Sequence, residues 1–491
     1  MKNIKIYAFA FGLFLLNGCT KDFATINTNN NAPTKNNPAT LLPSVIFEPI
    51  NPHMTMQMWL SDQIMHYYVR RNDNQLDVYN FAVGTTEQAR LNQFWQVHYS
   101  ALWNINDMVT AATEQKQDAY VAAGKIMRAY YLANITEMWG DAPAATAGKG
   151  SENTTPTYDT QKDIYTSVLA ELTAANTLLA TSPKFVGGGD VLFKGDAVKW
   201  RKLANSLRLR YLLRLSNKTE INAATEIAKI VADPTTFPII TSNAEAAIYD
   251  FTGVSPNTST VAAQPITVFS GLSMSKRIEE SFNVYGDPRV DFFFRKPVNA
   301  ATYPTHQGVP NGILRETAQS WNGNGDAHTS LLTTRFVLAP GTLDYTVMSY
   351  AEVQFILAEA AMKGWIPVTT TTAKQYYEAG ITANFAQWGI AIPSGFFALP
   401  QVAWDNTMAR LMDQKWMAFF YNNTLEAWGE QKRTGLPALK IGAQATTVTG
   451  GTVPTRVFYP TLEQSINAAN YGTAASRIGG DKITSKHWYQ N

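Results

Sequence analysis

The sequence has a single cysteine, Cys19, among its 491 residues. A chain with one cysteine cannot form an internal disulfide, and it lacks the paired thiolates that structural zinc sites use. The fold must therefore be stabilised by a packed core. The chain is long enough for a large core, because the fraction of surface buried on folding rises with chain length.

An excess of charge of one sign is also missing. The sequence holds 40 Lys and Arg residues against 38 Asp and Glu residues, and removal of Lys2 and Lys5 with a leader would leave 38 of each sign. Nucleic-acid binding needs a clustered basic excess. This balance therefore argues against a nucleic-acid partner.

Signatures of catalysis and of cofactor binding are missing as well. The sequence contains no nucleophile elbow and no paired metal-ligand motif. Its glycine run, residues 187–189, lacks the Lys and the Ser or Thr that must follow in a phosphate-binding loop. We therefore expect no cofactor, no metal and no enzymatic activity, which favours a binding protein over an exported hydrolase.

The one marked apolar run lies near the start of the chain. Lys2 and Lys5 precede the apolar residues 6–16, which is the layout of a secretory signal peptide. A spanning helix needs about 20 apolar residues, so this run is too short to anchor the protein. The sequence Leu16-Asn17-Gly18-Cys19 then resembles a bacterial lipobox, in which the cysteine thiol is acylated. The alternative is a chance cysteine beside an ordinary signal-peptidase site.

These features predict three parts of the chain. We expect residues 1–18 to be a lipoprotein signal peptide and residues 19–38 to be a flexible tether, since the latter are rich in Asn, Thr and Pro. Two or three acyl chains on Cys19 would anchor the protein stably in a membrane. The residues after Cys19 resemble signals that direct lipoproteins to the outer membrane and its exterior. Residues 39–491 are expected to form a single domain.

Helical periodicity dominates that domain. Apolar residues recur at spacings of three and four, the pattern of amphipathic helices. Long helices are expected at residues 87–112, 118–138, 160–181 and 196–217, and shorter ones at residues 219–232, 344–363, 373–388 and 405–421. Successive helix hairpins of this kind predict a mainly α fold with tetratricopeptide-like stacked helix pairs.

Three long stretches lack helical periodicity. They comprise residues 234–271, 294–342 and 438–460. Loops of this length within a compact domain are usually functional. We expect irregular loop insertions there, with a few short strands, for example around Ile313 and Phe336.

Several segments, in order along nearly the whole chain, resemble the SusD/RagB family of nutrient-binding outer-membrane lipoproteins, in its SusD-like branch. The early ones are residues 26–34, 95–106, 128–143, 158–161 and 200–210, the last reading WRKLANSLRLR. The later ones are residues 287–289, 350–360, 414–416, 426–428, 433–435 and 456–460.

This resemblance implies a helical scaffold that closes over a SusC-like, TonB-dependent outer-membrane barrel. It also implies that the protein binds a nutrient at the cell surface, most often an oligosaccharide and in some members a peptide, without cleaving it. Ligand residues vary between members, so no binding residue is carried over. A peptide-binding member, an exported hydrolase and a purely structural surface protein are the alternatives.

The charged residues of these segments are expected to be structural. Glu352 and Glu359 are seven residues apart on one helix, about 10.5 Å at 1.5 Å per residue, whereas glycosidase carboxylates face each other at roughly 5–9.5 Å. Pairing with Lys or Arg is therefore favoured over catalysis. A basic run is expected to form a solvated face or intrahelical ion pairs; it comprises Arg201, Lys202, Arg208, Arg210 and Arg214.

One further pair has a spacing that suits a metal. Asp62 and His66 are four residues apart, so they would share a helix face. No third ligand is evident, and we expect an ordinary surface pair.

A glycan site should combine Trp or Tyr with Asn, Asp or Arg on exposed loops, because sugars present C–H faces and hydroxyl groups. Two segments have this mixture. Residues 66–74, together with Tyr79, supply Tyr67, Tyr68, Arg71, Asn72 and Tyr79. Residues 321–326 supply Trp321, Asn322, Asn324 and Asp326.

Trp321 is the preferred anchor, because turn-forming residues surround it and no apolar stripe draws it inward. The alternative is that Tyr67 and Tyr68 end a buried helix and that Trp321 fills a loop. Residues 322–326 could offer oxygens to calcium, but they depart from EF-hand spacing, and we expect a polar turn.

Overall fold

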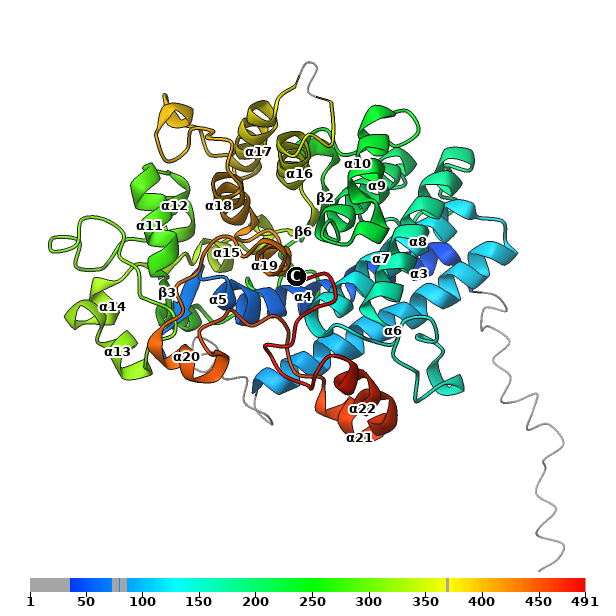
Figure 1. Cartoon of the computed structure of the whole chain (residues 1–491), viewed down its shortest axis with the longest axis horizontal. Coiled ribbons are helices and arrows are strands. Elements are labelled where there is room, and N and C mark those ends of the chain that lie inside the picture. Colours follow the sequence, from blue (N-terminus) through cyan, green and yellow to red (C-terminus); the bar gives the residue numbers. More distant parts are fainter. Residues whose placement is uncertain (1–35, 73–78, 80–85, 368–370, 491) are drawn as a thin grey trace, which may run out of the picture. The chain divides into compact units, whose positions relative to one another are not determined.

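The computed structural model describes residues 36–72, 79, 86–367 and 371–490 (Figure 1). Cys19, the expected leader and nearly all of the expected tether lie outside these residues. From Asn37 onward the chain forms one compact unit. Among the described residues, none of the helices combines the length and the apolar character needed to span a bilayer.

Four long helices form where periodicity predicts them: α6 (Thr86–Glu114), α7 (Asp118–Trp139), α8 (Gln161–Thr181) and α9 (Ala197–Arg214). Each packs against the next, and α3 (Pro38–Phe47) covers α6 and α7. The Thr160 side chain caps α8 and the Asp196 side chain caps α9, which fixes where both helices begin.

A second group of helices continues the stacking: α16 (Tyr350–Met362), α17 (Ala373–Gln387), α18 (Met408–Phe419) and α19 (Thr424–Thr434). Helix α16 packs against α17, α18 and α9, so it joins the two groups. A Cβ atom at Gly380 would lie 2.9 Å from the Phe355 ring, so the glycine allows α16 and α17 to approach closely. The predicted mainly α, tetratricopeptide-like stacking is confirmed.

Shorter elements fill the rest of the unit. The N-terminal ones are α4 (Ile50–Met56), the π-helical turn η1 (Gln57–Ser61) and α5 (Asp62–Ile64). The central ones are α10 (Ala223–Ala232), α11 (Lys276–Tyr285), α12 (Arg289–Phe293), α13 (Arg315–Gln319), α14 (Gly325–His328) and α15 (Arg335–Leu338). The C-terminal ones are α20 (Ala443–Thr449), α21 (Thr461–Ile466) and α22 (Ala468–Arg477).

Single 3-10 turns occur between these helices. They are η2 (Gly150–Glu152), η3 (Thr219–Ile221), η4 (Asn243–Glu245), η5 (Ile266–Gly271), η6 (Trp321–Gly323), η7 (Pro340–Thr342) and η8 (Phe396–Ala398).

The strands form two small antiparallel sheets. One has the order β1 (Tyr68–Arg70), β3 (Leu272–Met274), β5 (Leu331–Leu332) and β4 (Phe294–Arg295). In the other, β2 (Ala247–Tyr249) pairs with β6 (Tyr345–Met348). The first sheet places Tyr68 opposite Met274, so it brings residues near the start of the domain against the long irregular stretches.

Two predictions about local structure are wrong. Ile313 lies in a bend before α13, and Phe336 lies in the short helix α15, so neither belongs to a strand. The helix expected from residue 344 begins only at Tyr350, where the Ser349 side chain caps α16. The four residues before Ser349 are buried and pair with β2, because extended apolar residues there can complete a sheet.

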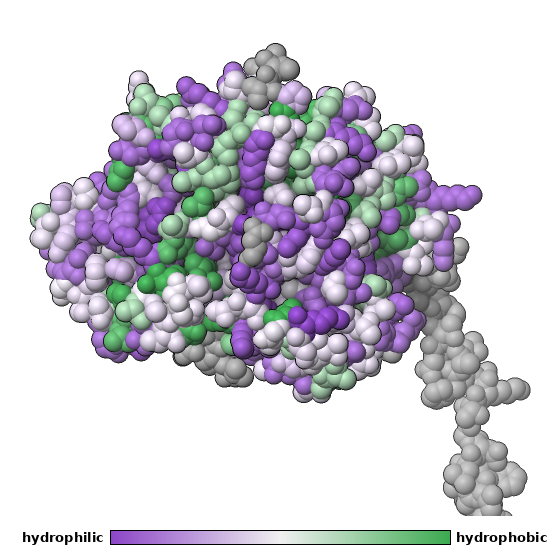
Figure 2. Space-filling model, viewed as in Figure 1, coloured by the Kyte–Doolittle hydropathy of each residue, from purple (hydrophilic) through white to green (hydrophobic). Residues whose placement is uncertain are grey.

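The core is rich in aromatic rings. Its largest fully buried side chains include Trp139, Trp200, Trp416 and Trp428. On the face drawn in Figure 2, hydrophilic residues predominate and hydrophobic residues gather only in small patches. Functional features must therefore be sought among local clefts and exposed rings.

Candidate functional site

The first predicted segment is largely buried. The Tyr67 hydroxyl donates to the Trp416 carbonyl oxygen at 2.6 Å. Its ring stacks on Trp416 and Phe420 with centroid separations of 4.9 and 4.8 Å. The Tyr68 hydroxyl donates to the Met58 carbonyl oxygen. The expectation that both tyrosines lie on an exposed loop is wrong: they are core residues just after α5, where distant rings pack on Tyr67 and β3 pairs with the backbone of Tyr68.

Arg71 and Tyr79 are also buried. The Arg71 guanidinium donates to the Ser270 carbonyl oxygen at 2.6 Å. The Tyr79 hydroxyl lies 2.9 Å from Nε2 of His66. These two side chains are therefore not on an exposed loop either. In this segment, Asn72 is the predicted residue that reaches the surface.

Trp321 takes an intermediate position. It begins the turn η6 between α13 and α14. Its ring is half-buried and packs against a small apolar cluster, separate from the main core, made of Val69, Val309 and Ala318. The expected turn geometry is present, and part of the indole stays open to solvent.

The polar neighbours of Trp321 hold this turn in shape. Asn322 has a left-handed backbone, with φ of 56°, and its carbonyl oxygen accepts from the Tyr303 hydroxyl at 3.1 Å. His328 Nδ1 lies 2.8 Å from the same oxygen. Asn324 is exposed, and Asp326 lies in α14. The segment is a polar turn, as expected.

The structure brings the two predicted segments together. Gln319 Nε2 donates to Asn72 Oδ1 at 3.3 Å. A Cβ atom at Gly325 would lie 3.0 Å from Arg71 Nη1, so the buried arginine packs closely against the backbone at Gly325. We call the resulting surface the Trp321 ledge; it consists of Asn72, Gln319, Trp321, Asn322 and Asn324.

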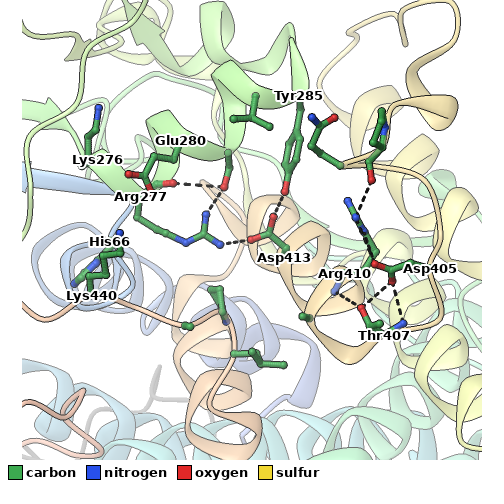
Figure 3. A pocket seen from close by; sticks show the side chains of 18 of the residues that line it. His66, Lys276, Arg277, Glu280, Tyr285, Asp405, Thr407, Arg410, Asp413 and Lys440 are labelled. Carbon is green, nitrogen blue, oxygen red and sulfur yellow. Dashed lines mark hydrogen bonds and ion pairs between the residues drawn. The ribbon is translucent and has the colours of Figure 1, made fainter.

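A cleft of about 760 Å³ (Figure 3) is linked to the ledge through residues 309–311. Helix α11, helix α18 and the segments near residues 310, 400–407 and 436–440 line it. Val309 packs in the Trp321 cluster, whereas Pro310 and Asn311 line the cleft, so one short segment joins the two features. Binding cavities for small ligands are typically about 300–1,000 Å³.

Charged side chains of both signs line this cleft. Arg277 and Tyr285, both on α11, donate to the carboxylate of Asp413 on α18. Burial, followed by the charge of Asp413, raises the pKa of Tyr285 well above its usual value, so this hydroxyl keeps its proton. The Asp405 carboxylate accepts from the Thr407 hydroxyl at 2.7 Å and lies 3.4 Å from the Arg410 guanidinium.

Two charges at the cleft remain available to a ligand. Glu280 and Lys440 are exposed, and among the described residues their side chains have no hydrogen-bond or ion-pair partner. The cleft therefore offers a free carboxylate and a free ammonium beside the paired groups. Such a lining suits a polar ligand rich in hydroxyl groups or bearing charges.

Asp62 and His66 are buried, so the expectation of a surface pair is wrong. Burial raises the pKa of Asp62 to about 7 and lowers the pKa of His66 to about 3. Among the described residues, no group of three His, Cys, Asp or Glu side chains is placed to hold a metal ion.

Within the basic run of α9, Arg208, Arg210 and Arg214 are buried, whereas Arg201 and Lys202 are only partly buried. The Arg210 guanidinium is about 1% exposed and donates to Glu352 Oε1 at 2.6 Å. It also lies 3.4 Å from Glu426 Oε1. The prediction that Glu352 has a structural partner is confirmed, whereas the prediction of solvated or intrahelical arginines is wrong for Arg210.

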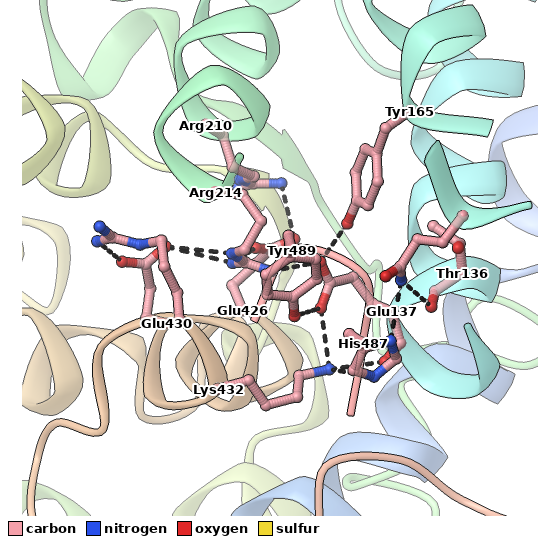
Figure 4. Close-up of polar contacts among 12 residues, drawn as sticks. Thr136, Glu137, Tyr165, Arg210, Arg214, Glu426, Glu430, Lys432, His487 and Tyr489 are labelled. Carbon is pink, nitrogen blue, oxygen red and sulfur yellow. Dashed lines mark hydrogen bonds and ion pairs between the residues drawn. The ribbon is translucent and has the colours of Figure 1, made fainter. Parts of the chain in front are cut away.

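Arg214, one turn further along α9, joins the same interior network (Figure 4). Its guanidinium lies 2.7 Å from Glu137, 2.8 Å from Glu426 and 3.3 Å from Glu430. Burial opposes ionisation of Glu137, but Arg214 and Lys432 hold its pKa well below the usual range. The network therefore links α7, α9 and α19 through paired, buried side chains.

The network continues to α16. Both terminal nitrogens of Arg433 donate to Glu359 at 2.7 Å, and Arg433 also pairs with Glu430. The structural role expected for Glu359 is confirmed. We call the buried residues Glu137, Arg210, Arg214, Glu352, Glu359, Glu426, Glu430, Lys432 and Arg433 the charge network. They are closed to a ligand and stabilise the helix stack.

Sequence reasoning missed the cleft because it missed α11. The signals were present: Ser275 caps the helix, Gly286 ends it in a left-handed conformation, and Ile278, Phe282 and Tyr285 share one buried face. Those residues alone would have predicted a helix. They would not have predicted that α11 faces α18, which lies more than a hundred residues further along the chain.

Comparison with known proteins agrees with the fold. A family model described as "Starch-binding associating with outer membrane" matches residues 30–460. A SusD homologue from Bacteroides fragilis has 26% identity and a TM-score of 0.78, over 93% of this chain and 100% of that one. A chitin-binding protein has 25% identity and a TM-score of 0.78, over 92% and 100%. No curated protein sequence matches the chain.

The family match covers most of the chain and includes the stacked helices, the charge network and the ledge. It also agrees with the resemblance carried by the ordered sequence segments. The chain therefore belongs to the SusD-like family of starch-binding proteins that associate with the outer membrane.

Proposed function

We propose that this protein is a cell-surface lipoprotein that binds an oligosaccharide and delivers it to a SusC-like, TonB-dependent outer-membrane transporter. The observation that carries this proposal is the match of residues 30–460 to a starch-binding family. The similarity to a chitin-binding protein supports a carbohydrate ligand. The protein acts by binding, not by catalysis.

The Trp321 ledge and the adjoining cleft form the proposed ligand site. A sugar ring stacks its C–H face on an indole, and its hydroxyl groups pair with planar amides. The ledge offers Trp321 for stacking and Asn72, Gln319 and Asn324 for hydrogen bonds. The cleft beside it offers room for further rings and a lining of carboxylates, guanidinium groups and hydroxyls.

A peptide ligand is the second candidate, and the unpaired charges of the cleft favour it. Glu280 would pair with an ammonium group and Lys440 with a carboxylate. An oligosaccharide remains the first choice because the ledge combines an indole with four amide side chains, and neutral sugars need no charged partner.

Direct binding without turnover tests the proposal. Maltoheptaose, chitohexaose and a mixed tryptic peptide pool should be titrated into the protein by calorimetry, and each recovered ligand should be analysed by mass spectrometry. We expect a glycan to bind and to be recovered intact. Cleavage of either glycan would support the exported hydrolase instead, and binding of peptides alone would support the second candidate.

The lipid anchor and the partner need separate tests, since Cys19 lies outside the described residues. Metabolic labelling with a fatty-acid analogue should mark the wild type and spare Cys19→Ala; equal labelling of both proteins contradicts the anchor. Affinity purification from detergent-solubilised outer membranes should recover a large β-barrel in near-stoichiometric amount. Recovery of the protein alone in several mild detergents contradicts the transporter partner.

A further inference from the structure

Trp103 is the most exposed tryptophan of the chain. The sequence contains twelve tryptophans, and the other eleven are buried or half-buried. Trp103 has 51% of its surface open to solvent. An exposed indole loses contact with the core and leaves a large apolar face in water. Such rings often serve as contact points for a ligand or a partner.

Trp103 stands at the edge of a groove of about 480 Å³. The walls are α6, the segment 143–156 and α21. None of the lining residues belongs to the Trp321 ledge or to its cleft, and in Figure 1 α6 and α21 lie well away from α13 and α14. We call this feature the Trp103 groove.

Hydrogen bonds hold the groove open without a ligand. The Tyr99 hydroxyl on α6 donates to the Pro143 carbonyl oxygen at 2.8 Å. Asn106, also on α6, donates to the Gly148 carbonyl oxygen at 2.8 Å. Both contacts fix the segment 143–148 along α6, so the groove is preformed.

The lining of the groove includes polar side chains that have no partner among the described residues. Gln96, Ser100 and Trp103 are spaced at i, i+4 and i+7, so they share one face of α6. Among the described residues, the side chains of Gln96, Ser100 and Lys149 have no hydrogen-bond or ion-pair partner. An amide, a hydroxyl and an ammonium group thus surround an open indole.

This combination favours a sugar over an apolar partner. An apolar ligand would cover the three polar groups and leave their hydrogen bonds unmade, which costs about 1–3 kcal/mol for each buried group. A sugar ring would stack on the indole and pair with all three groups. The groove volume falls within the range of small-ligand sites.

We propose that the Trp103 groove is a second binding site for rings of an oligosaccharide, separate from the Trp321 ledge. The inference rests on the proposed carbohydrate-binding function. Two separated sites on one protein would let a long glycan, or two glycans, be held at once, which raises the effective concentration at each site.

Fluorine NMR of the protein labelled with 5-fluorotryptophan separates the two sites. The resonance of Trp103 is assigned as the signal lost in Trp103→Phe, and that of Trp321 as the signal lost in Trp321→Phe. Maltoheptaose and chitohexaose are then titrated into the intact protein. We expect both resonances to shift with the same glycan, and the Trp103 resonance to shift in Trp321→Ala as well.

Two variants test the chemistry of the groove. Ser100→Ala should weaken the binding monitored at Trp103 by at least about 3-fold and leave the affinity monitored at the Trp321 resonance unchanged. Trp365→Ala is the matched control, since Trp365 is half-buried beside Lys363 and lines neither site. It should change neither titration.

The outcomes distinguish this inference from the proposed function. If the Trp321 resonance shifts and that of Trp103 does not, the second site is refuted and the proposed function stands. If neither shifts with either glycan, both are refuted. If Trp103→Ala reduces recovery of a β-barrel and no glycan moves the Trp103 resonance, the groove binds protein and the sugar site is refuted.

Discussion

The charge network and the cleft are built from the same kinds of residues, yet they do different work. In the network, Arg214 and Glu137 are almost fully covered, and their charges pair across helices. In the cleft, Arg277 is partly exposed and its partner Asp413 is largely buried, and both side chains line open space. Buried charges must be paired with each other, whereas cleft charges can also pair with a ligand.

This difference assigns separate tasks to the two regions. Most of the network residues lie in segments that resemble the family, the exceptions being Arg214, Glu430 and Lys432, and the network connects α7, α9, α16 and α19. The cleft and the Trp321 ledge come mostly from irregular stretches and from helices that join late in the chain. The charge network is therefore drawn mainly from segments that carry the family resemblance, whereas the proposed ligand site at the ledge and the cleft lies outside them.

Breaking the network should have the largest effect. Arg214→Met removes one cationic partner from each of three buried glutamates, which should lower the free energy of unfolding by about 3–5 kcal/mol. The loss is read from the midpoint of urea unfolding. Lys374→Met is the matched control, because Lys374 and Glu378 form an exposed pair on α17. Similar midpoints for the two variants would contradict a structural role for the network.

The buried carboxyl groups should respond to pH with opposite signs. The pKa of Asp62 is raised to about 7 by burial, so the folded state loses stability relative to the unfolded state as pH rises from about 4 to 7. Asp62→Asn removes this loss. The free energy of unfolding of the variant, relative to the wild type, should therefore increase by up to about 1.4 kcal/mol per pH unit in that window.

Glu137 supplies the contrast. Despite burial, its pKa lies well below the usual range, so its contribution to stability is present above about pH 4.5 and is lost as the pH falls further. Glu137→Gln should therefore be most destabilising near pH 7 and less so in acid. Urea midpoints between pH 3 and pH 8 check both variants. If the urea midpoints of Asp62→Asn and Glu137→Gln changed with pH in the same direction relative to the wild type, the opposite pKa shifts of Asp62 and Glu137 would be contradicted.

Breaking a cleft pair should have the smallest effect on stability. Arg277→Met removes a partner of Asp413 in a partly hydrated position, so the free energy of unfolding should fall by about 1 kcal/mol or less. If the cleft holds the ligand, glycan affinity should fall as well. A loss of stability as large as that of Arg214→Met would place Arg277 in the scaffold instead.

The sequence predicted the scaffold better than the site. The long helices α6 to α9 followed from their apolar spacing, and the caps at Thr160 and Asp196 placed two of their starts. Residues 345–348 were expected to be helical but form β6. Their partner strand β2 lies almost a hundred residues earlier, so the local sequence gives no sign of the pairing. Local patterns do not report such long-range pairing.

The site was only partly predictable for the same reason. The turn at Trp321 followed from its turn-forming neighbours, and the structure places that turn at the surface. Tyr67 and Tyr68 have the composition of a binding loop, but β3 and the ring of Trp416 cover them, and both partners come from distant parts of the chain. Burial of an aromatic side chain depends on tertiary contacts that composition does not contain.

The most direct test of the proposed site is a calorimetric titration of Trp321→Ala with the glycan that binds the wild type. Loss of a stacked ring at a binding hot spot should weaken the affinity by about 1–3 kcal/mol, or roughly 5- to 150-fold, with an unchanged urea midpoint. Trp365→Ala should bind like the wild type. Unchanged affinity in a normally folded Trp321→Ala protein would contradict the assignment of the ligand to the Trp321 ledge.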